Sequence, residues 1–380
     1  MRLALAQARR ASGRTFPNPP VGAVVFRGDR VLGRGATRPP GGPHAEVVAI
    51  EEAARRHGRA ALRGASLAVT LEPCSHHGRT GPCSEAIVRA GIARVCFGHR
   101  DPAPHVNGGG VRHLRRAGVS VEEGVLEEAC REQHRGFLSV LERGRPWLTL
   151  KLAASLDGRI ATAAGESRWI TSEAARAHVH RLRAGSDGIL VGAGTVRADD
   201  PELTARRAGR VVHRPLRIVV DARLRVPPEA RLLRAHPERT WIVCSESAPA
   251  RRRRALEARG VRVLALPPGP DGRPPLPAVL AALGAEGVGT VLCEGGGVLA
   301  AALLRAGLVD DLVWLLAPRL LGGDARPALG PLGLERLADA PRLPHARARR
   351  IGEDLLLAAR LSPLPSGVAA PAAAAARRSR

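Results

Sequence analysis

Short apolar blocks alternate with longer amphipathic stretches along the first part of the chain. The short blocks are too brief for helices and predict buried strands at 21–26, 67–71 and 94–97. The longer stretches carry apolar residues at helical spacing and predict helices near 44–57, 82–90, 111–117 and 125–142. This alternation predicts a sheet sandwiched between helices, which is an α/β fold.

A second series of the same kind begins at Trp147, after the segment Glu142–Pro146, which we interpret as a linker. Its later strands are expected at 188–191, 216–221, 241–244, 261–264, 290–293 and 311–317. Because 380 residues exceed what one core normally organises, we predict two domains, residues 1–144 and 146–361. Residues 362–380 are low in complexity, and we expect them to be disordered.

The formal net charge of +24 raises the question of a nucleic-acid partner. The charge is scattered, and one lysine stands against 58 arginines, with two asparagines, no tyrosine and 2% aromatic residues. This composition indicates a coding bias toward Arg, Ala, Gly and Pro. Single-stranded nucleic-acid sites need aromatic side chains for base stacking, and this chain has few. We therefore expect no nucleic-acid partner and interpret Arg251–Arg254 as a solvated helix start.

Cysteine content and hydropathy bear on the compartment. Six irregularly spaced cysteines do not form the framework of a secreted, disulfide-rich domain. The sequence contains no apolar run long enough for a membrane span, and its first ten residues are too short and amphipathic for a signal peptide. These features predict a cytoplasmic protein with no membrane partner.

Three potential metal ligands and one spare carboxylate form the most informative motif of the chain. His44 and Glu46 stand two residues apart, and Cys74 and Cys83 follow later. One imidazole and two thiolates leave the fourth position of a tetrahedral zinc ion to water, which the ion acidifies. In zinc deaminases the pattern H-x-E…P-C-x-x-C has this composition, and the Glu transfers protons. The order of residues here predicts one zinc ion per chain, with Glu46 as catalytic acid and base.

The spacing of the cysteines leaves a structural zinc site as an alternative. Eight residues separate Cys74 from Cys83 where the short form has two. Pro82 predicts that a helix begins at Cys83, which would favour its thiolate. His76 or His77 would supply a fourth ligand to a closed, structural site. Such a site has no use for Glu46, so we favour the catalytic interpretation.

Three segments together closely resemble the bifunctional riboflavin-biosynthesis deaminase/reductase family: Pro17–Val24, Gly42–Val47 and Thr70–Cys83. The resemblance extends from Met1 to about Leu361. It implies a cytidine-deaminase-like three-layer domain that deaminates a diaminopyrimidine carrying a phosphoribosylamino group. The second domain would then reduce the ribosyl group to a ribityl chain with NADPH. The family usually has Pro where Gly81 stands, and often a few more residues before the first helix; neither difference touches a presumed ligand.

Two glycine turns follow strands in the second half, at Val191–Val196 and Cys293–Val298. Glycine lets the backbone approach a phosphate, and a helix N-terminus adds free N–H groups. Neither turn has the third glycine of the dinucleotide motif G-x-G-x-x-G, which argues against a Rossmann domain. Each turn alone is equally consistent with a tight strand–helix connection. Together with Ser167–Thr171, Arg197–Arg206 and Ala317–Gly323, they resemble the family's reductase half, whose fold is similar to dihydrofolate reductase.

The resemblance also implies roles for individual residues of the second half. Those expected to contact NADPH are Ala153, Trp169, Thr195, Asp199, Gly296, Gly297, Val298, Leu299, Ala300, Ala301 and Ala302. Those expected to hold the substrate are Ser167, Arg183, Leu203, Arg206 and Glu294. The guanidinium groups of Arg183 and Arg206 suit a substrate phosphate, although Arg183 is also one of several arginines on a predicted helix.

Residue types that are rare in this chain carry separate information. Lys151 is the single lysine and ends an apolar strand. Either a compact ammonium group is required at this position, or the lysine has escaped the bias toward arginine by chance. We expect Lys151 and Glu294 to polarise the sugar and relay a proton. Asn18, one of two asparagines, lies between prolines; we expect its amide to bind substrate, while a plain turn asparagine is the alternative.

The sequence thus predicts a bifunctional hydrolase and oxidoreductase with a small phosphorylated pyrimidine as substrate, working as a homo-oligomer. One rival is a deaminase whose second half only binds nucleotide or scaffolds a dimer; the presence of Lys151 and of Glu294–Gly297 argues against it. A base deaminase acting on nucleic acid is the second rival, and the salt dependence of binding would identify it.

Overall fold

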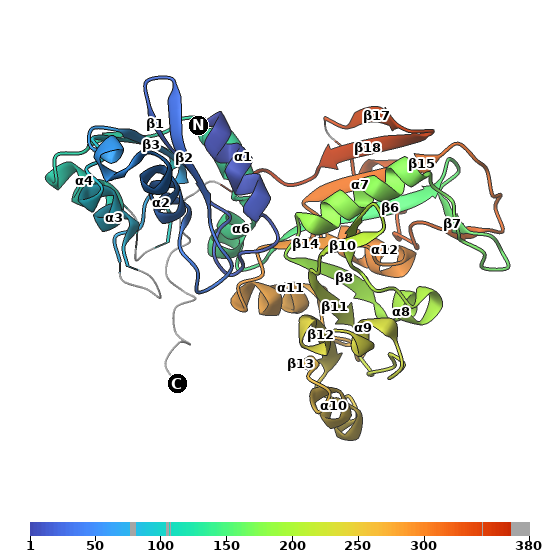
Figure 1. The fold of residues 1–380 in the computed structure, drawn as a ribbon. Coiled ribbons are helices and arrows are strands. Elements are labelled where there is room, and N and C mark those ends of the chain that lie inside the picture. The colour runs from blue at the N-terminus through green and yellow to red at the C-terminus, as the bar shows by residue number, and fades with distance from the viewer. Residues whose placement is uncertain (77–80, 104–105, 107, 344, 366–380) are drawn as a thin grey trace. The chain divides into compact units, whose positions relative to one another are not determined.

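The computed structural model describes residues 1–76, 81–103, 106, 108–343 and 345–365. It forms two compact units (Figure 1). Unit 1 comprises Met1–Pro146 and Gly284–Gly289 with the described end of the chain, and unit 2 comprises Trp147–Leu283 and Thr290–Pro363. From residue 366 onward, the tail predicted at 362–380 lies outside the described residues. Within the described residues, no helix has the length and apolar character that a membrane span requires.

Unit 1 contains, within its described residues, a five-stranded sheet of order β2-β1-β3-β4-β5. Its strands are β1 (Gly22–Arg27), β2 (Arg30–Ala36), β3 (Ser66–Leu71), β4 (Arg94–His99) and β5 (Ser120–Glu122). Its helices are α1 (Arg2–Ala11), α2 (Ala45–His57), α3 (Cys83–Arg89), α4 (Gly109–Arg116), α5 (Glu127–Gln133) and α6 (Arg135–Arg143), with a 3₁₀ turn η1 (Arg59–Leu62). β1 runs antiparallel to β2 and β3, whereas β3, β4 and β5 are parallel.

Glycines bring two helices of unit 1 into direct contact with opposite faces of the sheet (Figure 1). A Cβ atom at Gly22 would lie 2.0 Å from the carbonyl oxygen of Ala4 in α1. A Cβ atom at Gly35 would lie 2.0 Å from the carbonyl oxygen of Ala45 in α2. Gly35 pairs with Ala23, the neighbour of Gly22, and successive residues of a strand face opposite ways. Unit 1 is therefore a three-layer sandwich, and its core faces α2.

Unit 2 contains, in the part that the structure describes, a nine-stranded sheet of order β13-β12-β11-β8-β14-β6-β15-β18-β17. Its strands are β6 (Trp147–Ser155), β8 (Gly188–Gly192), β11 (Leu216–Val220), β12 (Thr240–Ser245), β13 (Arg262–Leu266), β14 (Thr290–Cys293), β15 (Asp311–Ala317), β17 (Arg347–Ile351) and β18 (Asp354–Arg360). The strands from β13 to β15 in this order are parallel, and β18 and β17 continue the sheet in antiparallel pairs.

Helices and short strands connect this sheet. The helices are α7 (Glu173–Ala184), α8 (Ala193–Asp199), α9 (Arg231–Arg234), α10 (Ala250–Glu257), α11 (Leu276–Ala285) and α12 (Gly297–Arg305), with 3₁₀ turns η2 (Pro237–Arg239) and η3 (Leu337–Asp339). Two small antiparallel pairs are β9 (Ala205–Arg207) with β10 (Arg210–His213) and β7 (Arg159–Ala161) with β16 (Arg326–Pro327). Ser172 caps α7 by accepting a hydrogen bond from the Ala175 N–H.

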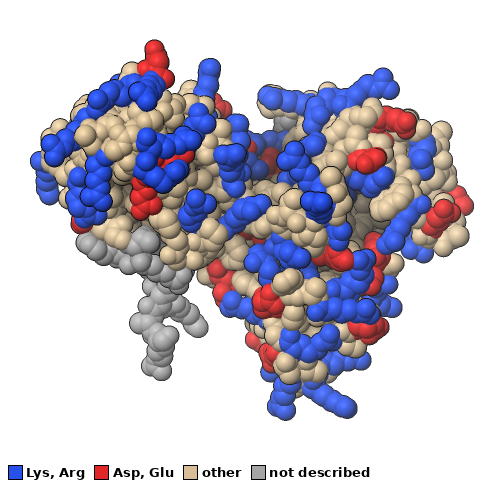
Figure 2. Space-filling view, in the orientation of Figure 1, with Lys and Arg blue, Asp and Glu red and all other residues tan. Residues whose placement is uncertain are grey.

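On the face shown in Figure 2, basic side chains are distributed rather than gathered in one groove. Lys and Arg cover both units there, and Asp and Glu lie among them. The run Arg251–Arg254 lies at the start of α10, which begins at Ala250. Arg253 is partly buried, and the other three arginines are exposed, as expected for a solvated helix start. On this face the positive charge is scattered, as expected from the composition.

The strands expected from apolar runs are present in the structure, but one expected helix is divided. The stretch 125–142 forms α5 and α6, which meet at His134. The His134 side chain is fully buried, and its Nδ1 lies 2.8 Å from Nε2 of His99 at the end of β4. Its Nε2 lies 3.2 Å from Oγ1 of Thr70 in β3. Periodicity detects the apolar face of this region but not the polar anchor that interrupts it.

We predict that the buried histidine pair makes unit 1 sensitive to acid. Burial lowers the pKa of His99 from its ordinary 6.5 to about 4 and lowers that of His134 well below 6.5. The unfolded chain therefore takes up protons first as the pH falls, and stability is lost between about pH 6.5 and 4. Between pH 7 and 5, His99 alone should cost on the order of 2 kcal/mol of unfolding free energy.

Amide hydrogen exchange of β3 and β4 peptides in urea would measure this loss. All four tryptophans, Trp147, Trp169, Trp241 and Trp314, lie in unit 2, so their fluorescence reports on the other unit in the same sample. A His99→Gln variant, whose amide does not titrate in this range, should lose much of the pH dependence. An unchanged pH dependence in that variant would contradict the assignment.

Candidate active sites in the two units

Three segments of unit 1 bring the predicted metal ligands together. His44 is the residue before α2, Cys83 is the first residue of α3, and Cys74 lies in the loop after β3. Nδ1 of His44 lies 3.2 Å from Sγ of Cys83 and 3.6 Å from Sγ of Cys74. The Cys83 N–H donates to the Cys74 sulfur at 3.4 Å. Two helix N-termini and one strand end thus converge on a single point.

The donor set fits zinc. The three ligand atoms all lie within 4.8 Å of one another. Ligands at zinc–nitrogen and zinc–sulfur bond lengths of a tetrahedral site are about 3.5 to 3.8 Å apart, close to the distances found here. Among the described residues, this group contains His44, Cys74 and Cys83 and no fourth protein ligand. His76 is not in the group, and His77 lies outside the described residues, so the three-ligand set favours a coordination position open to water.

Hydrogen bonds make the two thiols unequal. Hydrogen bonds from Cys83 and His44 lower the pKa of the Cys74 thiol to about 4, although its burial opposes this. The bond to Cys74, with burial, raises the pKa of Cys83 well above its usual range. The hydrogen bond to Cys74 also raises the pKa of His44. The site therefore stabilises the thiolate of Cys74. The thiolate is the form in which a cysteine binds a metal ion.

Glu46 lies in the first turn of α2 and is 4% exposed. Burial is the largest effect on its carboxyl group, and the nearby Cys74 adds to it, so that the pKa rises to about 7. A carboxyl group with a pKa near neutrality can both accept and return a proton. The sequence motif placed Glu46 beside the ligands, and the structure gives it the electrostatic surroundings of an acid–base group.

The other predicted residue of unit 1 is Asn18. It lies in the loop between α1 and β1, where its N–H donates to the Thr15 carbonyl at 2.8 Å. The turn is therefore real, and the expected binding role of the amide stays a prediction. Sequence reasoning did not select two buried carboxylates at the ends of neighbouring strands, Glu72 after β3 and Asp101 after β4. Each is an acidic residue within two positions of the end of an apolar strand. This position in the sequence is the signal that could have identified them.

In unit 2, the register of the sheet places Lys151 and Glu294 side by side. Cys293 of β14 pairs with Leu150 of β6, so the next residues, Glu294 and Lys151, are neighbours. The Lys151 Nζ lies 3.8 Å from Oε2 of Glu294. From α7, Arg183 donates to both Glu294 oxygens, from Nε at 2.6 Å and from Nη2 at 3.0 Å. Its Nη1 donates to the Thr204 carbonyl at 3.1 Å.

The charges of this triad affect one another's ionisation. Burial opposes ionisation of Glu294, but Arg183 and Lys151 outweigh it and lower the pKa of the carboxyl group to about 2. Burial lowers the pKa of Lys151, and the attraction of Glu294 offsets part of this effect. The Arg183 guanidinium is already engaged with Glu294, so its expected contact with a substrate phosphate stays a prediction that requires a shared or rearranged bond.

The two glycine turns follow strands, as the sequence predicted, and the structure shows that these strands, β8 and β14, are adjacent. Gly192 is the last residue of β8 and precedes α8, and Gly296 precedes α12 after β14. The Gly296 N–H donates to Oγ1 of Thr195 in α8 at 3.2 Å. In α12, Val298 is 69% exposed, whereas the side chains of Ala300 and Ala301 are buried. Val298 in the first turn of α12 is thus the exposed residue of Gly296–Ala302, and backbone N–H groups of a first turn are the ones that can bind an anion.

The remaining predicted residues of unit 2 differ in exposure and in the contacts that they make. Trp169 is 63% exposed, with the Arg176 guanidinium 4.6 Å above its ring. Arg206 of β9 donates to Glu202, to Thr204 Oγ1 and to the Gly209 carbonyl. Ala153 is in β6, Asp199 ends α8, Ser167 is half-buried and Leu203 is buried. Their expected ligand contacts stay predictions.

A cavity of about 470 Å³ in unit 2 is lined by residues of Ser167–Thr171 and Ala317–Gly323, which the sequence analysis named, and by Ser172, Glu353 and Asp354, which it did not select. Its lining includes Ile170–Ser172, Pro318–Leu321, Glu353 and Asp354. Asp354 accepts hydrogen bonds from the N–H and the hydroxyl of Ser172, at 2.8 and 2.7 Å, and so joins β18 to the start of α7. No local pattern marks Asp354, because its role depends on a strand added at the far end of the chain.

Comparisons with known proteins agree with this two-unit organisation. A family model described as the cytidine and deoxycytidylate deaminase zinc-binding region matches residues 1–99. A model described as the RibD C-terminal domain matches residues 146–357. The riboflavin biosynthesis protein RibD of Escherichia coli (strain K12) is 41% identical over 368 residues, covering 94% of this chain and 97% of that protein. The same-named protein of Bacillus amyloliquefaciens is 41% identical over 360 residues, covering 94% of this chain and 95% of that protein.

Solved structures extend the likeness to three dimensions. Acinetobacter baumannii RibD (form 1) has a TM-score of 0.83 at 36% identity and covers 95% of this chain and 98% of that chain. A Thermotoga maritima diaminohydroxyphosphoribosylaminopyrimidine deaminase/5-amino-6-(5-phosphoribosylamino)uracil reductase has a TM-score of 0.81 at 33% identity, covering 95% and 97%. The fold class predicted from the sequence, a cytidine-deaminase-like domain followed by a reductase domain, is confirmed.

We predict that Arg183 stabilises unit 2 by compensating the buried Glu294. Removal of one partner of a buried ion pair is strongly destabilising, and Lys151 compensates the remaining charge of Glu294 only in part, so Arg183→Met should lower the unfolding free energy by about 3 kcal/mol. Urea unfolding followed by tryptophan fluorescence would measure it. The control is Arg336→Met, which removes an exposed pair with Asp339 and should cost less than about 0.5 kcal/mol. Equal losses in the two variants would contradict the prediction.

Proposed function

Because the chain belongs to the family of riboflavin-biosynthesis deaminase/reductases, we propose that its two units act in turn on one small molecule. Unit 1 would deaminate 2,5-diamino-6-(5-phosphoribosylamino)pyrimidin-4-one, and unit 2 would then reduce the ribosyl group to ribityl with NADPH. The observation that carries the first assignment is the convergence of His44, Cys74 and Cys83 beside Glu46, a carboxylate that is not needed as a ligand.

In unit 1, His44, Cys74 and Cys83 would hold one zinc ion per chain. When bound, zinc would supply an acidified water as the nucleophile for hydrolytic deamination. Glu46, whose pKa burial raises to about 7, would accept a proton from that water and return it to the departing ammonia. Asn18 would bind the substrate through its amide. The Glu46 side chain is buried, which limits competition from bulk water for this proton.

In unit 2, Lys151 and Glu294 would act on the sugar. NADPH supplies the hydride of this reduction. The ionised Glu294 stabilises the charged form of Lys151 against the effect of burial. The ammonium group of Lys151 can then donate a hydrogen bond to a sugar oxygen and relay a proton. Arg183 holds Glu294 in place through its bidentate contact. Ser167, Leu203 and Arg206 would complete the substrate site.

The cofactor would lie across the two glycine turns. The N-termini of α8 and α12 provide N–H groups and a favourable dipole for phosphate groups near Thr195 and Gly296. Ala153, Trp169 and Asp199, with the turn from Gly296 to Ala302, are the proposed contacts. We also propose a homo-oligomer, which light scattering of the purified protein would test.

The most direct test of the overall function is product analysis by mass spectrometry. Purified protein given the diaminopyrimidine ribotide alone should produce the deaminated ribosyl compound. Addition of NADPH should convert that compound to its ribityl form. Deamination with no reduction under both conditions would favour the rival of a single-activity deaminase with a scaffolding second half.

We predict that Glu46→Gln separates metal binding from catalysis. The variant keeps all three ligands, so elemental analysis should still find about one zinc per chain. Deamination should fall by at least about a hundredfold, because the proton carrier is gone. Glu51→Gln, an exposed change on the same helix, is the control and should leave the rate unchanged. Wild-type deamination by Glu46→Gln would refute the role.

We predict that Lys151→Arg keeps the charge but lowers the reduction rate by at least tenfold, or about 1.4 kcal/mol of transition-state stabilisation. The planar guanidinium cannot take the place of a compact ammonium between strand β6 and Glu294. Single-turnover NADPH oxidation with deaminated substrate would measure the rate. Lys151→Met should be no better, and both variants should deaminate normally. Near-normal reduction by the arginine variant would show that the single lysine is an accident of composition.

A further inference from the structure

Glu72 occupies a position between the sheet and the metal-ligand loop of unit 1. It directly follows β3 and stands two residues before Cys74. Its backbone N–H donates to the His99 carbonyl at 3.0 Å, which continues the parallel pairing of β3 with β4. Glu72 is only 3% exposed, and its side chain turns inward. A buried carboxylate needs hydrogen-bond donors to offset the loss of water.

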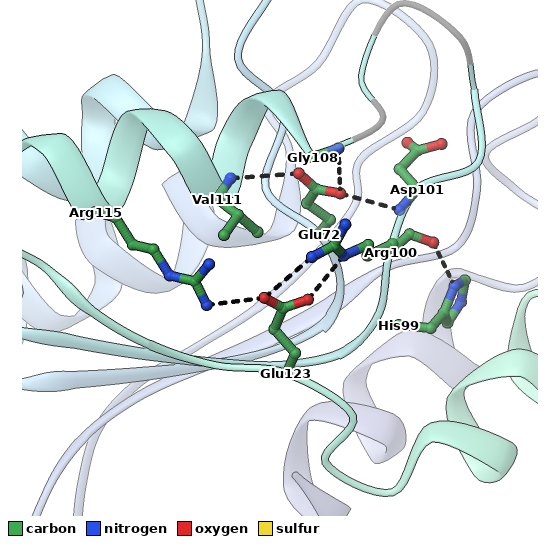
Figure 3. A network of polar contacts seen from close by, with 8 residues as sticks. All are labelled: Glu72, His99, Arg100, Asp101, Gly108, Val111, Arg115 and Glu123. Atoms are coloured by element: carbon green, nitrogen blue, oxygen red, sulfur yellow. Dashed lines mark hydrogen bonds and ion pairs between the residues drawn. The ribbon is translucent and has the colours of Figure 1, made fainter.

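The donors are three backbone N–H groups of a distant segment (Figure 3). Oε2 of Glu72 accepts from Asp101 at 3.3 Å and from Gly108 at 3.1 Å. Oε1 accepts from Val111 at 3.3 Å. One side chain therefore binds the end of β4 and the start of α4 at the same time.

Helix α4 lacks a cap of its own. The residue before it, Gly108, has no side chain and adopts φ +78°, and its first turn contains no acidic residue. The Glu72 carboxylate accepts from Gly108 and from Val111, the third residue of the helix, and so supplies both the cap and the negative charge that a helix N-terminus favours.

Helix α4 in turn lies directly against the ligand loop. A Cβ atom at Gly110 would fall 1.8 Å from the carbonyl oxygen of Pro73, and one at Gly109 would fall 2.4 Å from Oγ of Ser75. These two contacts flank Cys74 on both sides. The position of α4 therefore sets the position of the loop that carries the ligand.

We propose that Glu72 is a positioning residue of the deaminase site: by capping α4, its carboxylate holds this helix against the Cys74 loop and fixes Cys74 relative to His44 and Cys83. It touches no proposed ligand atom and acts through backbone. The proposal rests on the assignment of deamination to unit 1, but its effects on metal retention and on backbone protection do not depend on that activity.

The test is Glu72→Gln in the full-length zinc protein. Glutamine has the same shape but replaces one acceptor oxygen with an NH₂ group, so at least one of the three backbone N–H groups loses its partner. Zinc loss to a chelator should become at least about tenfold faster, and kcat/KM for deamination should fall at least about tenfold. Amide exchange should increase in the peptide covering α4. Reduction by unit 2 should stay within about twofold.

The matched control is Glu123→Gln. Glu123 belongs to the same polar network and pairs with Arg100 at 2.8 Å and with Arg115 of α4 at 2.9 Å, but these arginines are more than half exposed. Exposed pairs contribute little, so zinc retention and deamination should stay within about twofold of wild type. Gly110→Ala, which keeps Glu72 but pushes α4 from Pro73, should reproduce the Glu72→Gln defects.

Three results would overturn the proposal. Wild-type zinc retention in Glu72→Gln would show that the carboxylate does not position the loop. Fast exchange throughout unit 1 would assign Glu72 to the stability of the whole unit. Equal defects in Glu123→Gln would make the effect a general property of acidic residues around α4. If zinc retention and α4 protection change as expected while neither wild type nor variant deaminates, the positioning role stands and the proposed function fails.

Discussion

Parallel pairing of neighbouring strands is the constraint on which both sites depend. It brings chain segments that are far apart in sequence to the same edge of a sheet, where helices begin and backbone N–H groups are free. In unit 1 the pairing of β3 with β4 aligns the Cys74 loop with the segment that follows His99. In unit 2 the pairing of β14 with β6 and β8 aligns Glu294 with Lys151 and with the turn at Gly192.

The two sites treat a buried carboxyl group in opposite ways. Glu46 lies among sulfur atoms, and burial raises its pKa to about 7, so it can carry a proton in either direction. Glu294 lies between Arg183 and Lys151, which hold its pKa at about 2, so it stays a fixed negative charge. The residue type is the same, and its surroundings decide whether it transfers protons or orients a cation.

Sequence reasoning succeeded where chemistry is local. The three predicted metal ligands, which the structure brings together, lie in short motifs with Glu46, and the strands expected at 21–26 and 290–293 are apolar runs. It failed where a contact joins distant segments. Nothing near His134 indicates that its ring meets His99 and divides a helix, and nothing near Gly108 indicates that Glu72 supplies its cap. The engagement of Arg183 by Glu294 likewise appears only when the helix and strand are placed in space. Periodicity describes faces of elements, not which polar group on another element meets them.

The close contact of α2 with β2 explains how unit 1 tolerates the unusual composition of the chain. Gly33 and Gly35 lie against backbone atoms of Ala45, Ala49 and Ala53, where any larger side chain would collide. A chain rich in Ala and Gly supplies the two residue types found at this contact. Replacement of either glycine by a residue with a Cβ atom would therefore displace α2, and with it His44 and Glu46 at the start of that helix.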